Sequence, residues 1–167
     1  VVTVIGAGVA GTQSISKALD NHALVKVLDT SQSKLQQLQS EFGSSNIEYI
    51  LSTSDSVQSA VNESDMVIGS VYVVGKEAPK VVSRDMLKSM NPGTVMVDVS
   101  IDQGGCFESS RPTTHDNPTF LENDIVHYCV TNMPGAVPLT ATQALNKVTL
   151  SYICLLYTSD AADEHTG

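Results

Sequence analysis

Glycines at positions 6, 8 and 11 follow a short apolar run at the start of the 167-residue chain, in the stretch VVTVIGAGVAG. Apolar residues, this glycine spacing and a following helical segment favour a strand, a tight turn and a helix in succession. Gly6 permits the turn, Gly8 lets a pyrophosphate approach the backbone because it has no Cβ, and Gly11 lets helix and strand pack closely. The N–H groups that open such a helix attract an anion. The stretch therefore predicts a dinucleotide-binding unit.

Short runs rich in Val and Ile alternate with segments of helical spacing along the chain. Several runs are almost continuously apolar, which is typical of strands covered on both faces. We predict strands at Val1–Ile5, Leu24–Leu28, Ile47–Ile50, Met66–Val71, Thr94–Val99 and Val126–Val130. We predict helices at Val9–Asp20, Lys34–Phe42, about Ser56–Asn62, from Ser83 to the sequence MNPG, and about Thr140–Leu155. This order predicts an α/β fold, a Rossmann-type doubly wound parallel sheet with helices on both faces.

Two segments depart from this alternation. Residues 101–125 contain two prolines and paired glycines, which favours a functional loop or an interface element. The final stretch, LLYTSDAADEHTG, is polar and acidic and continues no earlier pattern. We therefore assign residues 1–154 to an NAD-binding Rossmann domain and residues 155–167 to a non-native or disordered tail.

Composition argues against several classes of partner. The formal net charge of −9 disfavours non-specific binding to nucleic acid or to an anionic membrane, because both need a basic surface. No apolar run reaches the roughly 18 residues that span a bilayer, and the first residues lack the pattern of a secretory signal. The scattered cysteines Cys106, Cys129 and Cys154 favour reduced thiols in a cytoplasmic protein over a disulfide framework or a metal site.

Asp29 ends the second predicted strand, in the sequence VKVLD. A carboxylate at this place accepts both hydrogen bonds of an adenosine ribose diol and repels a 2′-phosphate, which favours NAD over NADP. The structural alternative is an aspartate that caps the next helix. Lys34 either approaches the adenine or faces solvent. Val71 ends the fourth predicted strand and Tyr72 follows it, and the two form either a wall of the cofactor crevice or part of the sheet core.

The stretches VMVDVSIDQGGCFESSRPTTHDNPTF and VHYCVTNMPGAVPLTATQAL resemble the NAD-binding domain of the alanine dehydrogenase family. That family is related to the NAD(H)-binding subunit of proton-translocating transhydrogenase. The resemblance runs from Val1 to about Leu150. In the family, this domain is inserted into a catalytic domain that supplies a lysine and a histidine for the chemistry and an arginine for the substrate carboxylate. We therefore expect the chain to be a fragment of a longer enzyme and to be inactive alone.

The resemblance implies reversible oxidative deamination of L-alanine to pyruvate and ammonia, with hydride transfer to NAD, in a cytoplasmic homo-oligomer that is usually a hexamer. It places Ser52 and Lys34 at the adenosine half of NAD. Asp102 follows a predicted strand, and a carboxylate there either orients the nicotinamide ribose, positions the hydrolytic water or stabilises the imine, or it caps the next turn. We predict that Asp102 is catalytic and that the chain has no metal ligands. The predicted cofactor-binding residues are Gly6, Ala7, Gly8, Val9, Gly11, Asp29, Lys34, Ser52, Val71, Tyr72, Ile101, Asp102, Asn132 and Met133.

Other polar residues are better explained as structural. Arg111 is expected to brace its loop against Glu108 or a neighbouring subunit rather than to clamp a carboxylate. A lone histidine in a loop or strand, such as His115 or His127, is more often structural than catalytic. Nothing in the sequence around Cys106 lowers the pKa of its thiol, which favours packing over nucleophilic chemistry. Two other functions stay open: the NAD(H) domain of a transhydrogenase, and a non-catalytic NAD-sensing module.

Overall fold

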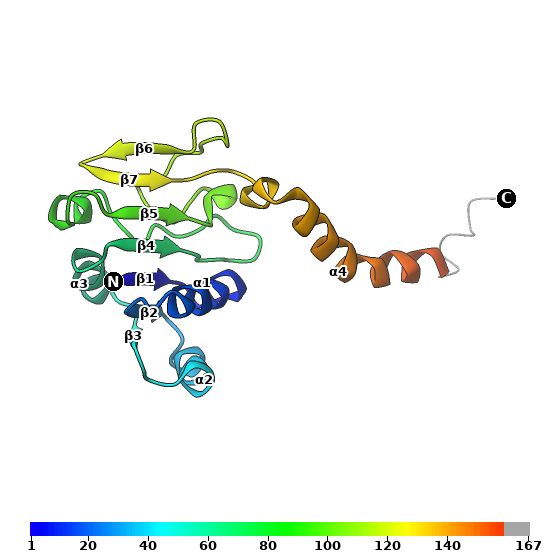
Figure 1. The fold of residues 1–167 in the computed structure, drawn as a ribbon, viewed down its shortest axis with the longest axis horizontal. Coiled ribbons are helices and arrows are strands. Elements are labelled where there is room, and N and C mark those ends of the chain that lie inside the picture. The colour runs from blue at the N-terminus through cyan, green and yellow to red at the C-terminus, as the bar shows by residue number, and fades with distance from the viewer. Residues whose placement is uncertain (159–167) are drawn as a thin grey trace. The chain divides into compact units, whose positions relative to one another are not determined.

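A seven-stranded sheet organises the first part of the chain in the computed structural model, which describes residues 1–158. Its strand order is β3-β2-β1-β4-β5-β7-β6, and all neighbouring strands are parallel except β6 and β7. In Figure 1 the arrow of β6 accordingly points against those of β7, β5 and β4. The strands are β1 Val2–Ile5, β2 Val25–Asp29, β3 Ile47–Leu51, β4 Met66–Gly69, β5 Val95–Asp98, β6 Thr119–Glu122 and β7 Ile125–Tyr128.

Two of the helices, α2 and α3, start at side-chain caps. Ser31 accepts the N–H of Lys34 at 3.3 Å on its side-chain oxygen and opens α2, and Thr53 and Ser56 form a capping box that opens α3. The helices are α1 Val9–Asp20, α2 Gln32–Phe42, α3 Ser54–Asn62 and α4 Pro138–Thr158, with shorter 3₁₀ helices η1 Met86–Ser89, η2 Ile101–Gln103 and η3 Met133–Ala136.

Helices cover both faces of the sheet, because successive strand residues point to opposite sides. Val4 packs with Ile15 of α1 and Leu38 of α2 on one face. On the other face, Val67 packs with Val61 of α3, in a cluster that also contains residues of η1. The predicted Rossmann-type doubly wound sheet is therefore confirmed.

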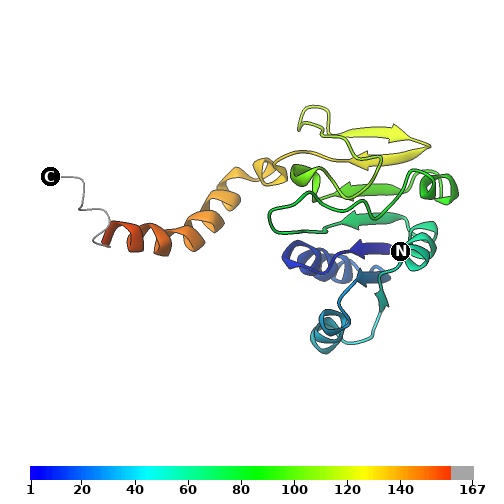
Figure 2. The same ribbon diagram turned by 180° about the vertical axis from the view of Figure 1, so that it is seen from behind.

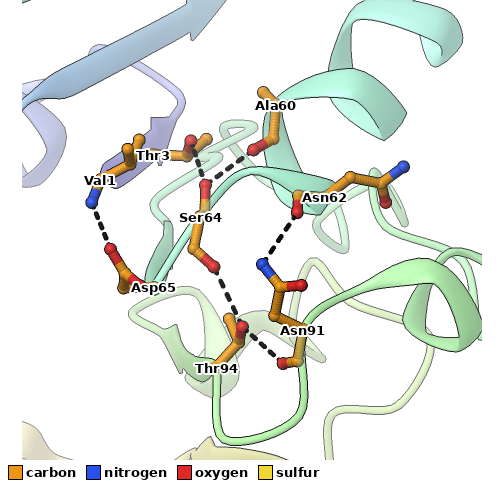
Figure 3. Close-up of polar contacts among 8 residues, drawn as sticks. All are labelled: Val1, Thr3, Ala60, Asn62, Ser64, Asp65, Asn91 and Thr94. Atoms are coloured by element: carbon orange, nitrogen blue, oxygen red, sulfur yellow. Dashed lines mark hydrogen bonds and ion pairs between the residues drawn. The ribbon is translucent and has the colours of Figure 1, made fainter.

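A buried polar cluster joins the amino-terminal ends of β1, β4 and β5 (Figure 3). The hydroxyls of Thr3 and Ser64 are 2.6 Å apart, and the Ser64 hydroxyl donates to the carbonyl of Ala60 at 2.7 Å. Thr94 donates to the carbonyls of Ser64 and Asn91 at 3.0 and 2.8 Å. Buried polar groups are tolerated when they are paired in this way. The cluster thus links the amino-terminal ends of these strands, at the edge of the sheet opposite their carboxyl ends.

The helix predicted from Ser83 is wrong in its length, since only the 3₁₀ helix Met86–Ser89 forms. The Ser83 hydroxyl does accept the N–H of Met86, at 3.3 Å. Immediately before it, however, the backbone of Val81 and Val82 pairs with the loop that follows β5, at 2.8 and 2.9 Å. That extended pairing leaves room for a single turn before Pro92 ends the segment.

The strand β6 lies inside residues 101–125, which we predicted as a loop. It forms a hairpin with β7 through Asn123 and Asp124, whose φ angles are 52° and 60°. Positive φ at both central residues is the condition for the hairpin turn that matches strand twist, and Asn and Asp tolerate it. The Asn-Asp pair is the sequence signal that marks this hairpin.

Residues from Asn132 onward form a separate unit, which contains η3 and α4. The helix α4 begins two residues before the predicted helix and continues to Thr158. Residues 159–167, which hold most of the predicted tail, lie outside the described residues, and the proposed division after residue 154 stays a prediction. Within residues 1–158, no helix is long and apolar enough to cross a membrane.

Candidate functional site

Three glycines lie in and just after the turn between β1 and α1, and the fold itself requires two of them but not the third. Gly6 has a φ of +92°, and a Cβ there would lie 2.7 Å from the carbonyl oxygen of Ser70. A Cβ on Gly11 would lie 1.9 Å from the carbonyl oxygen of Gly6. Gly8 has ordinary extended backbone angles, and a Cβ there would meet no atom within 4 Å. Contacts within the described chain therefore do not account for glycine at position 8.

The amino end of α1 is electrostatically suited to an anion. The helix begins at Gly8, whose position offers no side-chain cap, and its first turn contains no acidic residue. Unpaired N–H groups and the helix dipole place partial positive charge at such an end. A phosphate group would satisfy these donors.

Asp29, at the end of β2, holds the glycine turn in place. One oxygen of its half-buried carboxylate accepts the N–H of Ala7 at 2.8 Å, and the other accepts the N–H of Ser31 at 2.8 Å. Ser31, not Asp29, provides the side-chain cap of α2. Asp29 is therefore not the N-cap of α2 but braces the turns on either side of it, and each carboxylate oxygen keeps a lone pair for a further donor.

A cleft of about 770 Å³ opens at the carboxyl ends of β1, β2 and β4, where the strand order reverses between β1 and β4. This switch point is where doubly wound sheets bind ligands. Figure 2 shows from behind that the start of α1 and the chain leaving β4 lie at this same edge. The predicted cofactor residues that line the cleft are Gly6, Ala7, Gly8, Val9, Asp29, Lys34, Ser52, Val71 and Tyr72. Tyr72 is 67 % exposed, so it does not belong to the sheet core.

A smaller cleft of about 230 Å³ shares Ser70, Val71 and Tyr72 with the first and extends toward the end of β5. Asp102 and Gln103 line it on the β5 side. The two clefts thus adjoin at these shared residues, and Asp29 lines the larger one while Asp102 lines the smaller one. Two adjoining clefts suit an elongated ligand with two distinct ends.

Four predicted residues do not line these clefts, and one of them is Gly11, which packs against the backbone of Gly6. Ile101 is 4 % exposed and packs in the core, and it does not line either cleft. Asn132 and Met133 belong to the second unit, where Asn132 has a φ of 53° and precedes η3. The cofactor roles of all four stay predictions.

Asp98, which the sequence reasoning missed, is a fully buried carboxylate at the end of β5. It accepts the N–H groups of Ser100 and Cys106 at 3.0 and 2.8 Å, the more distant N–H of Phe107 at 3.4 Å, and the hydroxyl of Ser110. A Cβ on Gly105 would lie 2.7 Å from this carboxylate. One glycine of the IDQGG stretch therefore accommodates Asp98 instead of approaching a ligand. The available signal was an acidic residue at an inward-facing position of an apolar strand.

The remaining candidates have structural partners. His127 is buried, donates from Nδ1 to the carbonyl of Ile125 at 3.1 Å and accepts from the Ser109 hydroxyl at 2.7 Å, because neutral imidazole has one donor and one acceptor. Burial lowers the pKa of His127, which favours that neutral form. The Arg111 guanidinium lies 4.2 Å from the centre of the Phe120 ring, so it stacks on an aromatic side chain rather than bracing Glu108.

The thiol of Cys106 is buried beside the carboxylate of Asp98. Burial of Cys106, together with the nearby Asp98 carboxylate, raises the pKa of its thiol far above the usual value. A thiol in this state is a poor nucleophile. Among the described residues, no cluster of His, Cys, Asp or Glu has the arrangement of a metal site.

Comparison with known proteins identifies the family. The family model described as "Alanine dehydrogenase/PNT, C-terminal domain" matches residues 1–166. The chain belongs to this family. The resemblance to the alanine dehydrogenase family, inferred from the IDQGG and NMPGAVP stretches, is thereby confirmed.

Individual relatives agree with this family assignment. An alanine dehydrogenase of Halomonas elongata is 51 % identical over 155 residues, which cover 93 % of this chain and 42 % of that protein. A solved structure of an L-alanine dehydrogenase matches with a TM-score of 0.87 and 45 % identity, over 91 % of this chain and 42 % of that one. A transhydrogenase of Sinorhizobium meliloti matches with a TM-score of 0.80 and 27 % identity, over 91 % of this chain and 43 % of that one. The chain thus spans less than half the length of these relatives of the alanine dehydrogenase/PNT family.

Proposed function

We propose that this chain is the NAD-binding part of an alanine dehydrogenase, an enzyme that reversibly converts L-alanine to pyruvate and ammonia with hydride transfer to NAD. Gly8 carries the proposal: the fold does not require glycine there, whereas a pyrophosphate lying on the start of α1 does. The 51 % identity to an alanine dehydrogenase supports the substrate. The lysine, histidine and arginine of the family's chemistry are expected in the rest of the full-length protein.

The wider cleft suits the adenosine half of NAD. Each oxygen of Asp29 is fixed by one backbone N–H and has a lone pair left for a hydroxyl of the adenosine ribose. The charge of the same carboxylate disfavours a 2′-phosphate, which supports NAD over NADP. Ser52 and Lys34 line the cleft next to Asp29 and are proposed to contact the adenosine.

The smaller cleft suits the nicotinamide half. NAD supplies the hydride acceptor of the reaction when it is bound. The exposed carboxylate of Asp102 lines this cleft, and we propose that it orients the ribose, positions the hydrolytic water or stabilises positive charge that develops on the imine. The roles near the nicotinamide that the family resemblance implies for Ile101, Asn132 and Met133 are also part of the proposal.

A transhydrogenase NAD(H) domain is the second candidate, favoured by the TM-score of 0.80 to the transhydrogenase structure. The lower identity to that protein, 27 % against 45 % for the L-alanine dehydrogenase structure, supports the first candidate. NADH formation that depends on alanine, measured with the full-length protein, separates the first candidate from the transhydrogenase and from a non-catalytic NAD-sensing module. Assembly as a cytoplasmic homo-oligomer, as in the resembled family, is also part of the proposal.

The experiment compares NAD binding by the 167-residue chain with that of the Gly8→Ala variant, by calorimetry and by the fluorescence of bound NADH. The chain contains no tryptophan, so its own emission does not obscure that of NADH. An added methyl group at position 8 meets no protein atom within 4 Å, so the variant is expected to melt like the wild type. It is expected to bind NAD at least about tenfold more weakly, because close charge-assisted contacts are lost.

The matched control is Gln13→Ala, on the exposed side of α1, which is expected to bind like the wild type. Unchanged NAD affinity in a folded Gly8→Ala variant would contradict a pyrophosphate at this turn. Absence of NAD binding by the wild type would contradict the proposed cofactor.

A further inference from the structure

The backbone of Gln103 is fixed from both sides. Its N–H donates to the carbonyl of Ser100 at 2.9 Å, and its carbonyl accepts the N–H of Ala78 at 3.0 Å. The next residue, Gly104, has a φ of +86°, and its carbonyl accepts a hydrogen bond from the Lys80 ammonium. The segments after β4 and β5 thus hold the start of the Gln103 side chain in one place.

The side-chain oxygen of Gln103 has no hydrogen-bond partner. Oε1 is buried. Among the described residues that are not exposed, it is the one buried side-chain nitrogen or oxygen without a hydrogen-bond partner. Leaving a buried polar group unpaired is unfavourable, and such groups in native proteins call for an explanation. A fixed backbone that carries an unpaired amide oxygen indicates an acceptor whose donor comes from outside the described residues.

The position of Gln103 indicates which donor this is. The residue lines the smaller cleft beside Ser100 and Asp102, whereas Asp29 lines the larger one. In the binding mode proposed above, the smaller cleft receives the nicotinamide, whose carboxamide carries an N–H₂ group. A glutamine oxygen accepts such an N–H, and the last torsion of a glutamine side chain is broad enough for the amide to turn toward the cleft.

On the basis of the proposed function, we propose that Gln103 is a positioning residue that accepts a hydrogen bond from the nicotinamide carboxamide on Oε1. The contact fixes the rotation of the ring within the cleft and so determines which face of the ring meets the substrate. It also gives the buried oxygen its partner. Gln103 therefore distinguishes a carboxamide from a group of similar shape that has no N–H donor.

The test measures dissociation constants of the 167-residue chain for NAD, ADP-ribose and 3-acetylpyridine adenine dinucleotide by calorimetry. In the acetylpyridine compound a methyl group replaces the carboxamide nitrogen, and ADP-ribose has no pyridine ring. The wild type is expected to bind NAD about fivefold more tightly than the acetylpyridine compound, the contribution of one hydrogen bond. The Gln103→Met variant, of similar length but without the acceptor, is expected to lose this preference and to keep the wild-type affinity for ADP-ribose.

The control is Gln39→Met on the exposed surface of α2, which is expected to keep the preference. A preference that persists in a folded Gln103→Met variant would overturn the assignment. If that variant does not fold, the affinities of the wild type still test the assignment. Equal wild-type affinities for NAD and the acetylpyridine compound would overturn it without the variant. Failure of the wild type to bind both NAD and ADP-ribose would instead overturn the proposed function on which the assignment rests.

Discussion

Replacing Asp98 by asparagine tests whether one buried carboxylate organises the loop that carries Asp102. The substitution keeps the volume and removes the charge and one acceptor oxygen. If the asparagine oxygen occupies the place of Oδ2, it retains the N–H groups of Cys106 and Phe107 and the hydroxyl of Ser110. The amide nitrogen then faces the N–H of Ser100, which lies 3.0 Å from Oδ1 in the native protein.

The magnitude follows from these bonds. An orphaned buried N–H costs about 1–3 kcal/mol, and each retained bond weakens by about 1 kcal/mol when its acceptor becomes neutral. The lower desolvation cost of a neutral amide offsets part of this loss. We therefore expect Asp98→Asn to lower the free energy of unfolding by about 3 kcal/mol, a large share of the stability of a domain of this size.

Urea denaturation followed by circular dichroism measures this difference. The matched control is Asp116→Asn, in an exposed loop, which is expected to change the free energy of unfolding by less than about 0.5 kcal/mol. Equal stability of Asp98→Asn and the control would refute the reasoning, because it would mean that these hydrogen bonds contribute nothing net.

Three further predictions concern the cofactor, pH and thiols. Asp29→Ala is expected to weaken NAD binding about tenfold and to raise the affinity for NADP relative to that for NAD. Titration of the variant with both nucleotides measures this, and an unchanged preference would rule out the proposed role of Asp29. Burial lowers the pKa of His127 from the ordinary value of 6.5, so the unfolded chain takes up a proton first as pH falls below 6.5, and the free energy of unfolding declines. Urea titrations of His127→Asn should show a shallower decline, and an equal slope in the wild type would contradict this. Burial raises the pKa of the Cys106 and Cys129 thiols, whereas Cys154 is exposed. Ellman's reagent should therefore modify Cys154 in the native chain and all three cysteines after denaturation. Rapid labelling of Cys106 in the native chain would be inconsistent with its buried position.

The elements that local signals specify were predictable from the sequence. The helix Val9–Asp20 has the predicted bounds, because the glycine turn before it and its apolar spacing are contained in the same 20 residues. The length of the short helix Met86–Ser89 was not predictable, because it depends on pairing with a segment distant in the chain. The strand Thr119–Glu122 was missed, although the Asn-Asp turn that follows it is a local signal. Periodicity describes a segment alone and carries no information about its partners.

The same distinction applies to the candidate site. The position of Asp29 at the end of a strand follows from the sequence, but its hydrogen bond to Ala7, 22 residues earlier, follows only from the fold. Asp98 lies in an apolar strand, and its burial was open to inference from alternation. The unpaired oxygen of Gln103 has no sequence signal, because it is defined by the absence of neighbours that the fold brings near.

The hydrogen bond from the Ala7 N–H to the Asp29 carboxylate has a consequence for redesign of nucleotide choice. The acid that is proposed to select against a 2′-phosphate also holds the turn on which the diphosphate is proposed to lie. Truncating Asp29 therefore loosens the turn while it removes the charge, so a gain for NADP would be accompanied by weaker binding of either dinucleotide. A substitution such as Asp29→Asn keeps an oxygen for the Ala7 N–H, although its amide nitrogen then faces the N–H of Ser31. It removes the charge while disturbing the turn less than truncation does, and is the more suitable starting point for engineering.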